Sequence, residues 1–263
     1  MAAHRRGAPA RLTDGQQHFL RSRLAAEVVA AACLDVDDLV LELGAGTGRL
    51  TEHLGRAAGR VVAVERDPRL ADGLRRRFAG DPRVRVLHAD LLSVGMPAER
   101  HRVVANLPFG VSTAALRMLL DDPRSALAGA DLIVQHGLAR KRAVLRPCTM
   151  LSLSWLPWWT LELGRVLPAA AFEPPPAVDA ALLRIRRRQP AMLDPGRAGG
   201  YRMLLRRAFR HGDAPIRRSL GLAPAQWRRF CRERGLSTDA RPPQLDVWDW
   251  VALYAQARGR GNC

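Results

Sequence analysis

The stretch "VVANLPFG" (103–110) places an amide, a proline and an aromatic ring where an apolar run ends. Asn106 and Pro108 are ordinary turn residues, but a turn does not need the aromatic Phe109. The residues before Asn106 have the apolar character of a buried strand, and a helical pattern begins near Ser112. The stretch is therefore either a plain strand-to-helix turn or a set of groups directed at a ligand.

A second candidate is the glycine-rich stretch "LELGAGTGRL" (41–50). Glycines at 44, 46 and 48 let the backbone approach a ligand closely, and the start of the next helix favours polar or anionic groups. Their G-x-G-x-G spacing differs from the G-x-G-x-x-G of dinucleotide binders, so pyrophosphate is not the favoured ligand. A tight turn between strand and helix explains the motif equally well when it is taken alone.

Two acidic residues stand at the ends of apolar runs. Glu65 ends "VVAVE", and Asp90 ends "VLHAD". A carboxylate in the first position can accept both hydroxyls of a ribose, and one in the second can accept from the exocyclic amine of an adenine. Each could also be a solvated acid at a strand end, and Asp67 is interpreted as a helix cap with Pro68 after it. Together with the glycine loop, these acids predict a nucleoside site at the C-terminal edge of a sheet.

The elements that must position these residues alternate between strand and helix patterns. Strands are predicted at 39–43, 60–65, 84–90, 101–106, 130–135 and 179–187, with helical patterns between most of them. This order predicts an α/β fold with a parallel, doubly wound sheet. We also expect a helix over 19–34 and an extended, aromatic segment over 151–167. From about residue 190 the pattern becomes helical, polar and basic, and Trp227, Trp248 and Trp250 are expected to pack its core.

Charge is the strongest compositional signal. The chain of 263 residues carries a formal net charge of +17, and residues 181–263 hold 18 arginines against six acidic residues. Such an asymmetry favours a polyanionic partner, most often nucleic acid. The four cysteines form no C-x-x-C pair and the histidines show no metal-ligand spacing, so we predict no metal. No apolar run could span a bilayer and no signal-peptide core is visible, which predicts a cytoplasmic protein with no membrane partner.

Several motifs together resemble those of one enzyme family. The chain resembles S-adenosylmethionine-dependent adenine-N6 methyltransferases and, within them, the Erm family of 23S rRNA adenine dimethyltransferases. The stretches that carry the resemblance are "GQQHFL" (15–20), "LELGAGTG" (41–48), "VVAVERD" (61–67), "HADLL" (88–92), "VVANLPFGVST" (103–113), "VQHGLARKRA" (134–143) and "GRVLPAAAFEPPPAVDAALLRIRRR" (164–188). The last of these and "WLPWW" favour Erm over its relative, the KsgA type that dimethylates small-subunit rRNA.

The resemblance implies a Rossmann-like class I methyltransferase sheet with a small C-terminal helical domain. It divides the chain into a basic arm (1–15), a cofactor-binding catalytic domain (16–188) and a basic, helical RNA-binding domain (189–263). It also implies that the Asn106 side chain and the Leu107 carbonyl accept from the target amine. Pro108 then sets the turn, and Phe109 stacks on the adenine, with Phe172 as a second aromatic near that pocket.

The cofactor implied is S-adenosylmethionine. The residues implied to bind it are His18, Leu20, Glu42, Gly44, Gly46, Glu65, Asp90 and Asn106. His18 stands where the family has asparagine, and a packing role there is as compatible with the sequence as a ligand contact.

The partner implied is 23S rRNA, bound by a monomer before the ribosome is fully assembled. The candidate RNA contacts are Arg140, Lys141, Arg142, Arg206, Arg207 and Arg210, with Arg217 and Arg218 as further candidates. The implied activity gives resistance to macrolides, lincosamides and streptogramin B. Two alternatives stay open, a KsgA-type small-subunit enzyme and a non-catalytic nucleic-acid-binding relative.

Overall fold

The computed structural model describes residues 18–146, 148–212 and 214–258. The predicted basic arm (1–15) lies outside the described residues. None of the helices within these three ranges is long and apolar enough to cross a bilayer.

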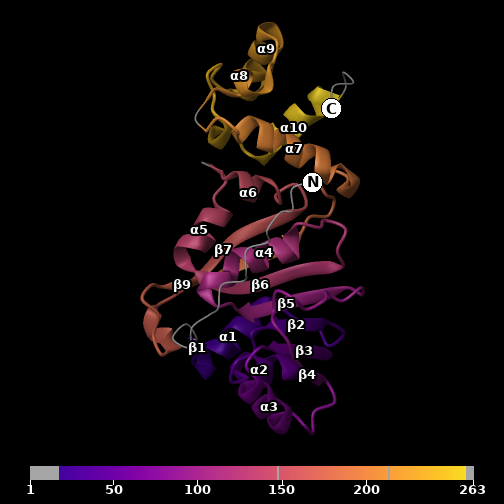
Figure 1. Ribbon diagram of the computed structural model, residues 1–263, viewed down its shortest axis with the longest axis vertical. Coiled ribbons are helices and arrows are strands. Elements are labelled where there is room, and N and C mark those ends of the chain that lie inside the picture. Colours follow the sequence, from indigo (N-terminus) through magenta and orange to yellow (C-terminus); the bar gives the residue numbers. More distant parts are fainter. Residues whose placement is uncertain (1–17, 147, 213, 259–263) are drawn as a thin grey trace, which may run out of the picture.

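A seven-stranded sheet forms the centre of the molecule, in the order β4-β3-β2-β5-β6-β9-β7 (Figure 1). Its strands are β2 (Leu39–Leu43), β3 (Arg60–Glu65), β4 (Val84–His88), β5 (His101–Asn106), β6 (Leu127–Gln135), β7 (Trp159–Leu167) and β9 (Ala180–Arg187). The five strands β2 to β6 run parallel, as predicted, and the α/β sheet is confirmed.

The prediction of a wholly parallel sheet is wrong at its last two strands. β9 is inserted between β6 and β7 and pairs antiparallel with both. The reason lies in the connection from β7 to β9, which contains a short 3-10 turn (Ala169–Ala171) and the two-residue strand β8 (Phe172–Glu173). A parallel crossover needs a connection long enough to return along the sheet, usually a helix, and this segment has none.

Helices cover both faces of the sheet. They are α1 (Ser22–Ala32), α2 (Arg49–Ala57), α3 (Pro68–Arg77), α4 (Ser112–Leu120) and α5 (His136–Ala143). Successive residues of a strand point to opposite faces, and β5 shows this clearly. Val104 belongs to the core cluster that contains α1 and α2, whereas Val103 belongs to the cluster that contains α4. The two clusters therefore fill the two faces of one sheet.

The aromatic segment 151–167 is not extended throughout, which corrects the sequence prediction. A short helix, α6 (Met150–Leu153), begins where the Thr149 side chain accepts from the Ser152 amide, and the strand starts only at Trp159. Trp155 and Trp158 lie in the turns between them and donate to Asp121 and to the Leu193 carbonyl. The two tryptophans at these positions therefore reflect packing in the core and do not mark a strand.

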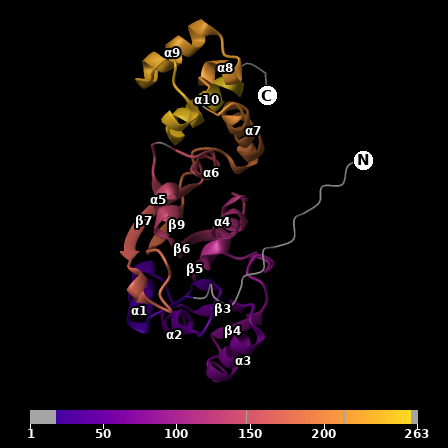
Figure 2. The same ribbon diagram turned by 60° about the vertical axis from the view of Figure 1, so that its left-hand side comes forward.

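In the described part of the chain after the sheet, four α-helices stack beyond α6 (Figure 2). They are α7 (Ala198–Phe209), α8 (Ile216–Leu220), α9 (Pro224–Arg234) and α10 (Val247–Arg258). Their buried side chains belong to the core cluster that also contains Val103 and α4. Trp227 and Trp250 are buried as expected, but Trp248 is 45% exposed, so its predicted place in the core is wrong. The domain boundary near residue 188 stays a prediction.

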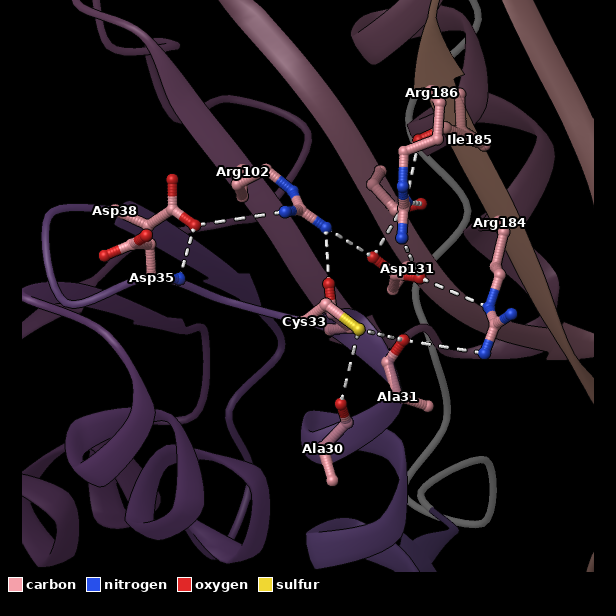
Figure 3. A network of polar contacts seen from close by, with 12 residues as sticks. Ala30, Ala31, Cys33, Asp35, Asp38, Arg102, Asp131, Arg184, Ile185 and Arg186 are labelled. Atoms are coloured by element: carbon pink, nitrogen blue, oxygen red, sulfur yellow. Dashed lines mark hydrogen bonds and ion pairs between the residues drawn. The ribbon is translucent and has the colours of Figure 1, made fainter.

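A buried carboxylate joins α1 to the sheet (Figure 3). Asp131 of β6 is fully buried and forms ion pairs with Arg102 of β5 at 3.0 Å and Arg186 of β9 at 2.9 Å. Arg102 also donates to the Ala32 carbonyl at the end of α1, at 2.9 Å. Cations are favourable at a helix C-terminus, where carbonyls lack partners. The network therefore fixes the C-terminal end of α1. The N-terminal end of this helix follows residues of the candidate site described below.

Candidate active site

The carboxyl ends of four neighbouring strands bring the predicted ligand residues to one edge of the sheet. Gly44 follows β2, Glu65 ends β3, Asp90 follows β4, and Asn106 ends β5. A Cβ built on Gly44 would lie 3.8 Å from the Pro108 side chain and 4.0 Å from the Asn106 carbonyl oxygen. The glycine loop and the "NLPF" turn are thus in contact, as the convergence of parallel strands requires.

The glycine loop has a backbone that only glycine adopts without strain. Gly44, Gly46 and Gly48 all have positive φ, at 78°, 57° and 81°. Gly46 also has no room for a side chain, since a Cβ there would lie 2.7 Å from the Phe19 ring. Both the backbone conformation and the close packing therefore require glycine here. A plain turn would not require glycine at all three positions.

Glu65 is held in place by the loops on either side of it. Its Oε2 accepts from the Gly46 amide at 2.7 Å, and its Oε1 accepts from the Asp67 amide at 2.8 Å. The side chain is buried. Each carboxylate oxygen can accept more than one hydrogen bond, so Glu65 keeps capacity for a ligand hydroxyl while it orders the glycine loop.

Asp90 stays partly exposed at the next strand end. Its Oδ1 accepts from the Leu92 amide at 2.8 Å, and its Oδ2 lies 4.0 Å from Arg66. The first contact fixes the turn, and the second is a weak, exposed ion pair. The carboxylate can therefore accept from a ligand amine at small cost.

Glu42 behaves differently from the other acids. It is fully buried within the sheet, and its Oε2 accepts from the Thr51 hydroxyl at 2.6 Å. Burial is the main cause that raises the pKa of Glu42 to about 8; the Thr51 hydrogen bond opposes this shift, and the nearby Glu65 charge adds to it. The carboxyl therefore faces α2 rather than the solvent at the strand edge.

This raised pKa predicts a pH-dependent stability that a Glu42→Gln variant lacks. Folded protein keeps the Glu42 proton up to about pH 8, whereas the unfolded chain loses it near 4.5. Stability from this group is complete below 4.5 and is lost as pH rises toward 8. We expect the unfolding free energy of the parent chain, relative to the variant, to fall by about 1.4 kcal/mol per pH unit between these values. Urea unfolding at several pH values measures it, and parallel pH curves would contradict the prediction.

The "NLPF" turn closes the site. The Asn106 Nδ2 donates to the His18 carbonyl at 2.7 Å. Since a carbonyl can only accept, this bond determines which end of the amide is which, and it leaves Oδ1 to accept from another donor. The Ser112 hydroxyl donates to the Pro108 carbonyl at 3.1 Å and holds the turn. Phe109 is half-buried, and its ring centroid lies 5.9 Å from that of His18.

The segment 18–20 is not part of a helix, which corrects the prediction of a helix over 19–34. Phe19 and Leu20 form β1, which pairs antiparallel with β8, and α1 begins only at Ser22. Leu20 lies opposite Phe172 in this pair, and its carbonyl accepts from Arg49 at 3.0 Å. Pairing with β8 therefore overrides the helical pattern of these residues and places them against the glycine loop.

The remaining predicted residues differ in exposure. Phe172 is only 1% exposed and lies in the core cluster with Leu20, so its place at a target pocket stays a prediction. Arg142 is 7% exposed and donates to the Thr149 hydroxyl at 2.7 Å. We therefore exclude it from the candidate RNA contacts. The other arginine and lysine candidates are exposed: Arg140, Lys141, Arg206, Arg207 and Arg210.

Sequence reasoning missed the groups that support this site. Thr51 contacts Glu42 of the preceding strand, whereas the Pro174 carbonyl and Asp131 contact residues that are more distant in the chain. An apolar strand containing the acid Asp131 was a visible signal for a buried ion-pair network. Thr51 and the Pro174 carbonyl have no local signal, because a hydroxyl in a helix and a backbone oxygen in a loop are ordinary.

Comparisons with known proteins agree on one family. The family model described as "Ribosomal RNA adenine dimethylase" matches residues 9–256. An rRNA adenine N-6-methyltransferase of Bacillus anthracis is 33% identical over 243 residues, which cover 92% of this chain and 85% of that protein. The mycinamicin-resistance protein MyrB of Micromonospora griseorubida is 37% identical over 228 residues, covering 85% and 71%.

Two further matches concern the small subunit and the fold. A ribosomal RNA small subunit methyltransferase A of Dehalococcoides mccartyi is 31% identical over 252 residues, which cover 90% of this chain and 85% of that protein. The crystal structure of the 23S rRNA methyltransferase ErmE superposes with a TM-score of 0.81 and 28% identity. This alignment covers 90% of this chain and 98% of that one.

Proposed function

The chain belongs to the ribosomal RNA adenine dimethylase family, and we propose that it methylates N6 of a specific adenine in the peptidyl-transferase loop of 23S rRNA. Such a modification would confer resistance to macrolides, lincosamides and streptogramin B. The observation that carries the proposal is the oriented Asn106 amide beside the glycine loop. The names of MyrB and ErmE favour this rRNA over the small-subunit one.

The site fits S-adenosylmethionine, the cofactor that the family implies. Gly44 leaves an open approach to the backbone, Glu65 presents a buried carboxylate for ribose hydroxyls, and Asp90 presents a partly exposed one for the adenine amine. Gly46, Leu20 and Asn106 complete the wall on either side. We leave the buried Glu42 out of this set. When bound, the cofactor supplies an electrophilic methyl group.

Adenine N6 is a poor nucleophile because its lone pair is delocalised into the ring. We assign the Asn106 Oδ1 and the Leu107 carbonyl as acceptors for the two N6 hydrogens, which aims the nitrogen lone pair at the methyl donor. Phe109 stacks on the target base once the base has left its RNA context. Catalysis is then mainly positioning, and the amine loses its proton readily after methylation without a strong general base.

Replacing Glu65 by glutamine is expected to weaken cofactor binding at least about tenfold. The glutamine amide cannot accept from the Gly46 and Asp67 amides at both ends, so one bond becomes a donor–donor contact. Calorimetry with S-adenosylhomocysteine measures the dissociation constant. The matched control is Glu99→Gln, which makes the same exchange at an exposed ion pair with Arg60. Equal affinities in Glu65→Gln and the parent protein would refute the assignment.

RNA affinity is expected to fall steeply with salt, because arginine–phosphate contacts release counterions. Replacing exposed Arg206 by alanine should reduce the slope of log K against log salt by about 1. Filter binding to a 23S transcript between about 50 and 200 mM salt tests this. Arg83→Ala, which removes an arginine paired with Asp81, is the control and should leave the slope unchanged.

The function is tested by methyl transfer from labelled cofactor to transcripts of both rRNAs. Incorporation into a 23S transcript that carries the peptidyl-transferase loop, with a primer-extension stop at one adenine, supports the proposal. Incorporation into small-subunit rRNA alone would move the substrate to the small subunit. Expression in a macrolide-sensitive host then tests resistance, and unchanged sensitivity despite methylation would remove the resistance role.

A further inference from the structure

The short segment His18–Leu20 contacts several parts of the candidate site. Its first residue accepts from the Asn106 side chain, its second packs on Gly46, and its third accepts from Arg49 at the start of α2. The same segment pairs with Phe172 and Glu173 of β8. It therefore touches the glycine loop, the "NLPF" turn and the loop that follows β7.

Among the residues that the structure describes, the His18 side chain contacts two segments, and neither is the glycine loop. Its Nδ1 lies 2.9 Å from the Pro174 carbonyl oxygen, so Nδ1 carries the proton and donates. Its ring lies 5.9 Å from the Phe109 ring at a tilted angle of 41°, within the range of favourable aromatic pairs. His18 thus joins the segment after β8 to the aromatic residue of the turn.

Phe109 needs such a neighbour. A phenyl ring makes no strong hydrogen bond, so its orientation depends on the groups packed around it. Phe109 is half-buried, begins a single 3-10 turn (Phe109–Val111), and packs at the margin of the core cluster that contains Phe172. A ring meant to stack on a base must be held in one orientation before the base arrives, because misplacement by about 1 Å can cost a hundredfold in rate.

We propose that His18 is a positioning residue for the target base. Its ring connects Pro174 to Phe109 and holds the stacking surface, while the adjacent Phe19 packs on Gly46 of the glycine loop and the Leu20 carbonyl accepts from Arg49 of α2. His18 therefore acts on the methyl-transfer step through Phe109 and leaves cofactor affinity unchanged. This inference rests on the proposed function, since it concerns the same site.

Three substitutions separate its contacts. His18→Ala removes both, His18→Asn retains a donor for the Pro174 carbonyl without a ring, and His18→Phe retains a ring without a donor. We expect each to lower kcat, by about tenfold or more for alanine. The dissociation constant of S-adenosylhomocysteine should change less than about threefold. If a substitution only damaged the fold, thermal stability would fall, and the binding of the cofactor and of the RNA would weaken together. His211→Ala, an exposed histidine after α7, is the control and should change neither kcat nor affinity.

A double-mutant cycle with Phe109→Leu tests the route of action. If His18 acts through Phe109, the double variant His18→Ala/Phe109→Leu should be no slower than Phe109→Leu alone. Additive losses would overturn the proposal. So would a tenfold weaker cofactor affinity with unchanged kcat, which would make His18 a cofactor ligand instead.

Hydrogen exchange of the free protein provides a test that does not depend on the substrate. In His18→Ala, peptides covering 107–113 and 172–178 should exchange faster than in the parent protein, while a peptide covering 84–90 should not change. Unchanged exchange in the first two peptides would overturn the proposal that His18 holds these two segments together. If the parent protein methylates no rRNA, the proposed function fails, but this measurement still decides whether His18 holds the two segments.

Discussion

Replacing Asn106 by aspartate is expected to lower kcat/KM for rRNA methylation by at least about a hundredfold, as is replacement by alanine. The aspartate is the same size, but both of its oxygens only accept. One of them would face the His18 carbonyl, which the Asn106 Nδ2 contacts at 2.7 Å, so an attractive contact becomes a repulsive one. The side chain would then turn away from the geometry that presents an acceptor to the target amine.

The aspartate variant also separates two mechanisms. If residue 106 acted as a general base, a carboxylate would serve at least as well as an amide, and Asn106→Asp would stay active. Positioning by an oriented amide requires that the variant be nearly inactive. Gln256→Glu makes the same amide-to-carboxylate exchange at an exposed position of α10 and controls for added charge. Single-turnover methylation with saturating cofactor is the measurement, and activity of Asn106→Asp within tenfold of the parent would refute the assignment.

Replacing Asp131 by asparagine is expected to reduce the unfolding free energy by about 3–5 kcal/mol. The carboxylate is fully buried and pairs with Arg102 and Arg186, while Arg184 approaches it at 3.9 Å. An amide of the same size leaves the guanidinium of Arg102, whose side chain is only 10% exposed, in a poorly solvated place without this counter-charge, whereas Arg184 and Arg186 are partly exposed to water. The effect exceeds that of a surface pair because water cannot replace the lost partner.

Denaturant unfolding followed by circular dichroism measures this loss. For a chain of this length each kcal/mol corresponds to roughly 2–4 °C in Tm, so a fall of roughly 6–20 °C is expected. Asp72→Asn removes an exposed partner of Arg75 on α3 and should cost less than about 1 kcal/mol. If Asp131→Asn were as stable as this control, the network would be only a surface-like arrangement.

The positions of the candidate ligand groups at the sheet edge could be predicted because they follow a local rule. An apolar run that stops at Glu65 or Asn106 marks a strand end, and parallel strands place their ends at one edge. The helix over 19–34 failed at its first residues, because Phe19 and Leu20 pair with a segment more than 150 residues away. Dependence on distant parts of the chain also explains why the parallel direction predicted for β9 is wrong. The direction of β9 depends on how the chain returns after β7.

What the sequence alone determined is the order of chemistry along the sheet edge: a glycine loop, two acids and an amide, each at the end of an apolar run. Tertiary structure decided what those groups can do. It buried Glu42 against Thr51, buried Arg142 away from solvent, and joined Asn106 to a carbonyl 88 positions away in the chain. Strand ends follow from local hydrophobic patterns, whereas the orientation of an amide and the burial of a charge depend on contacts that form only when the chain folds.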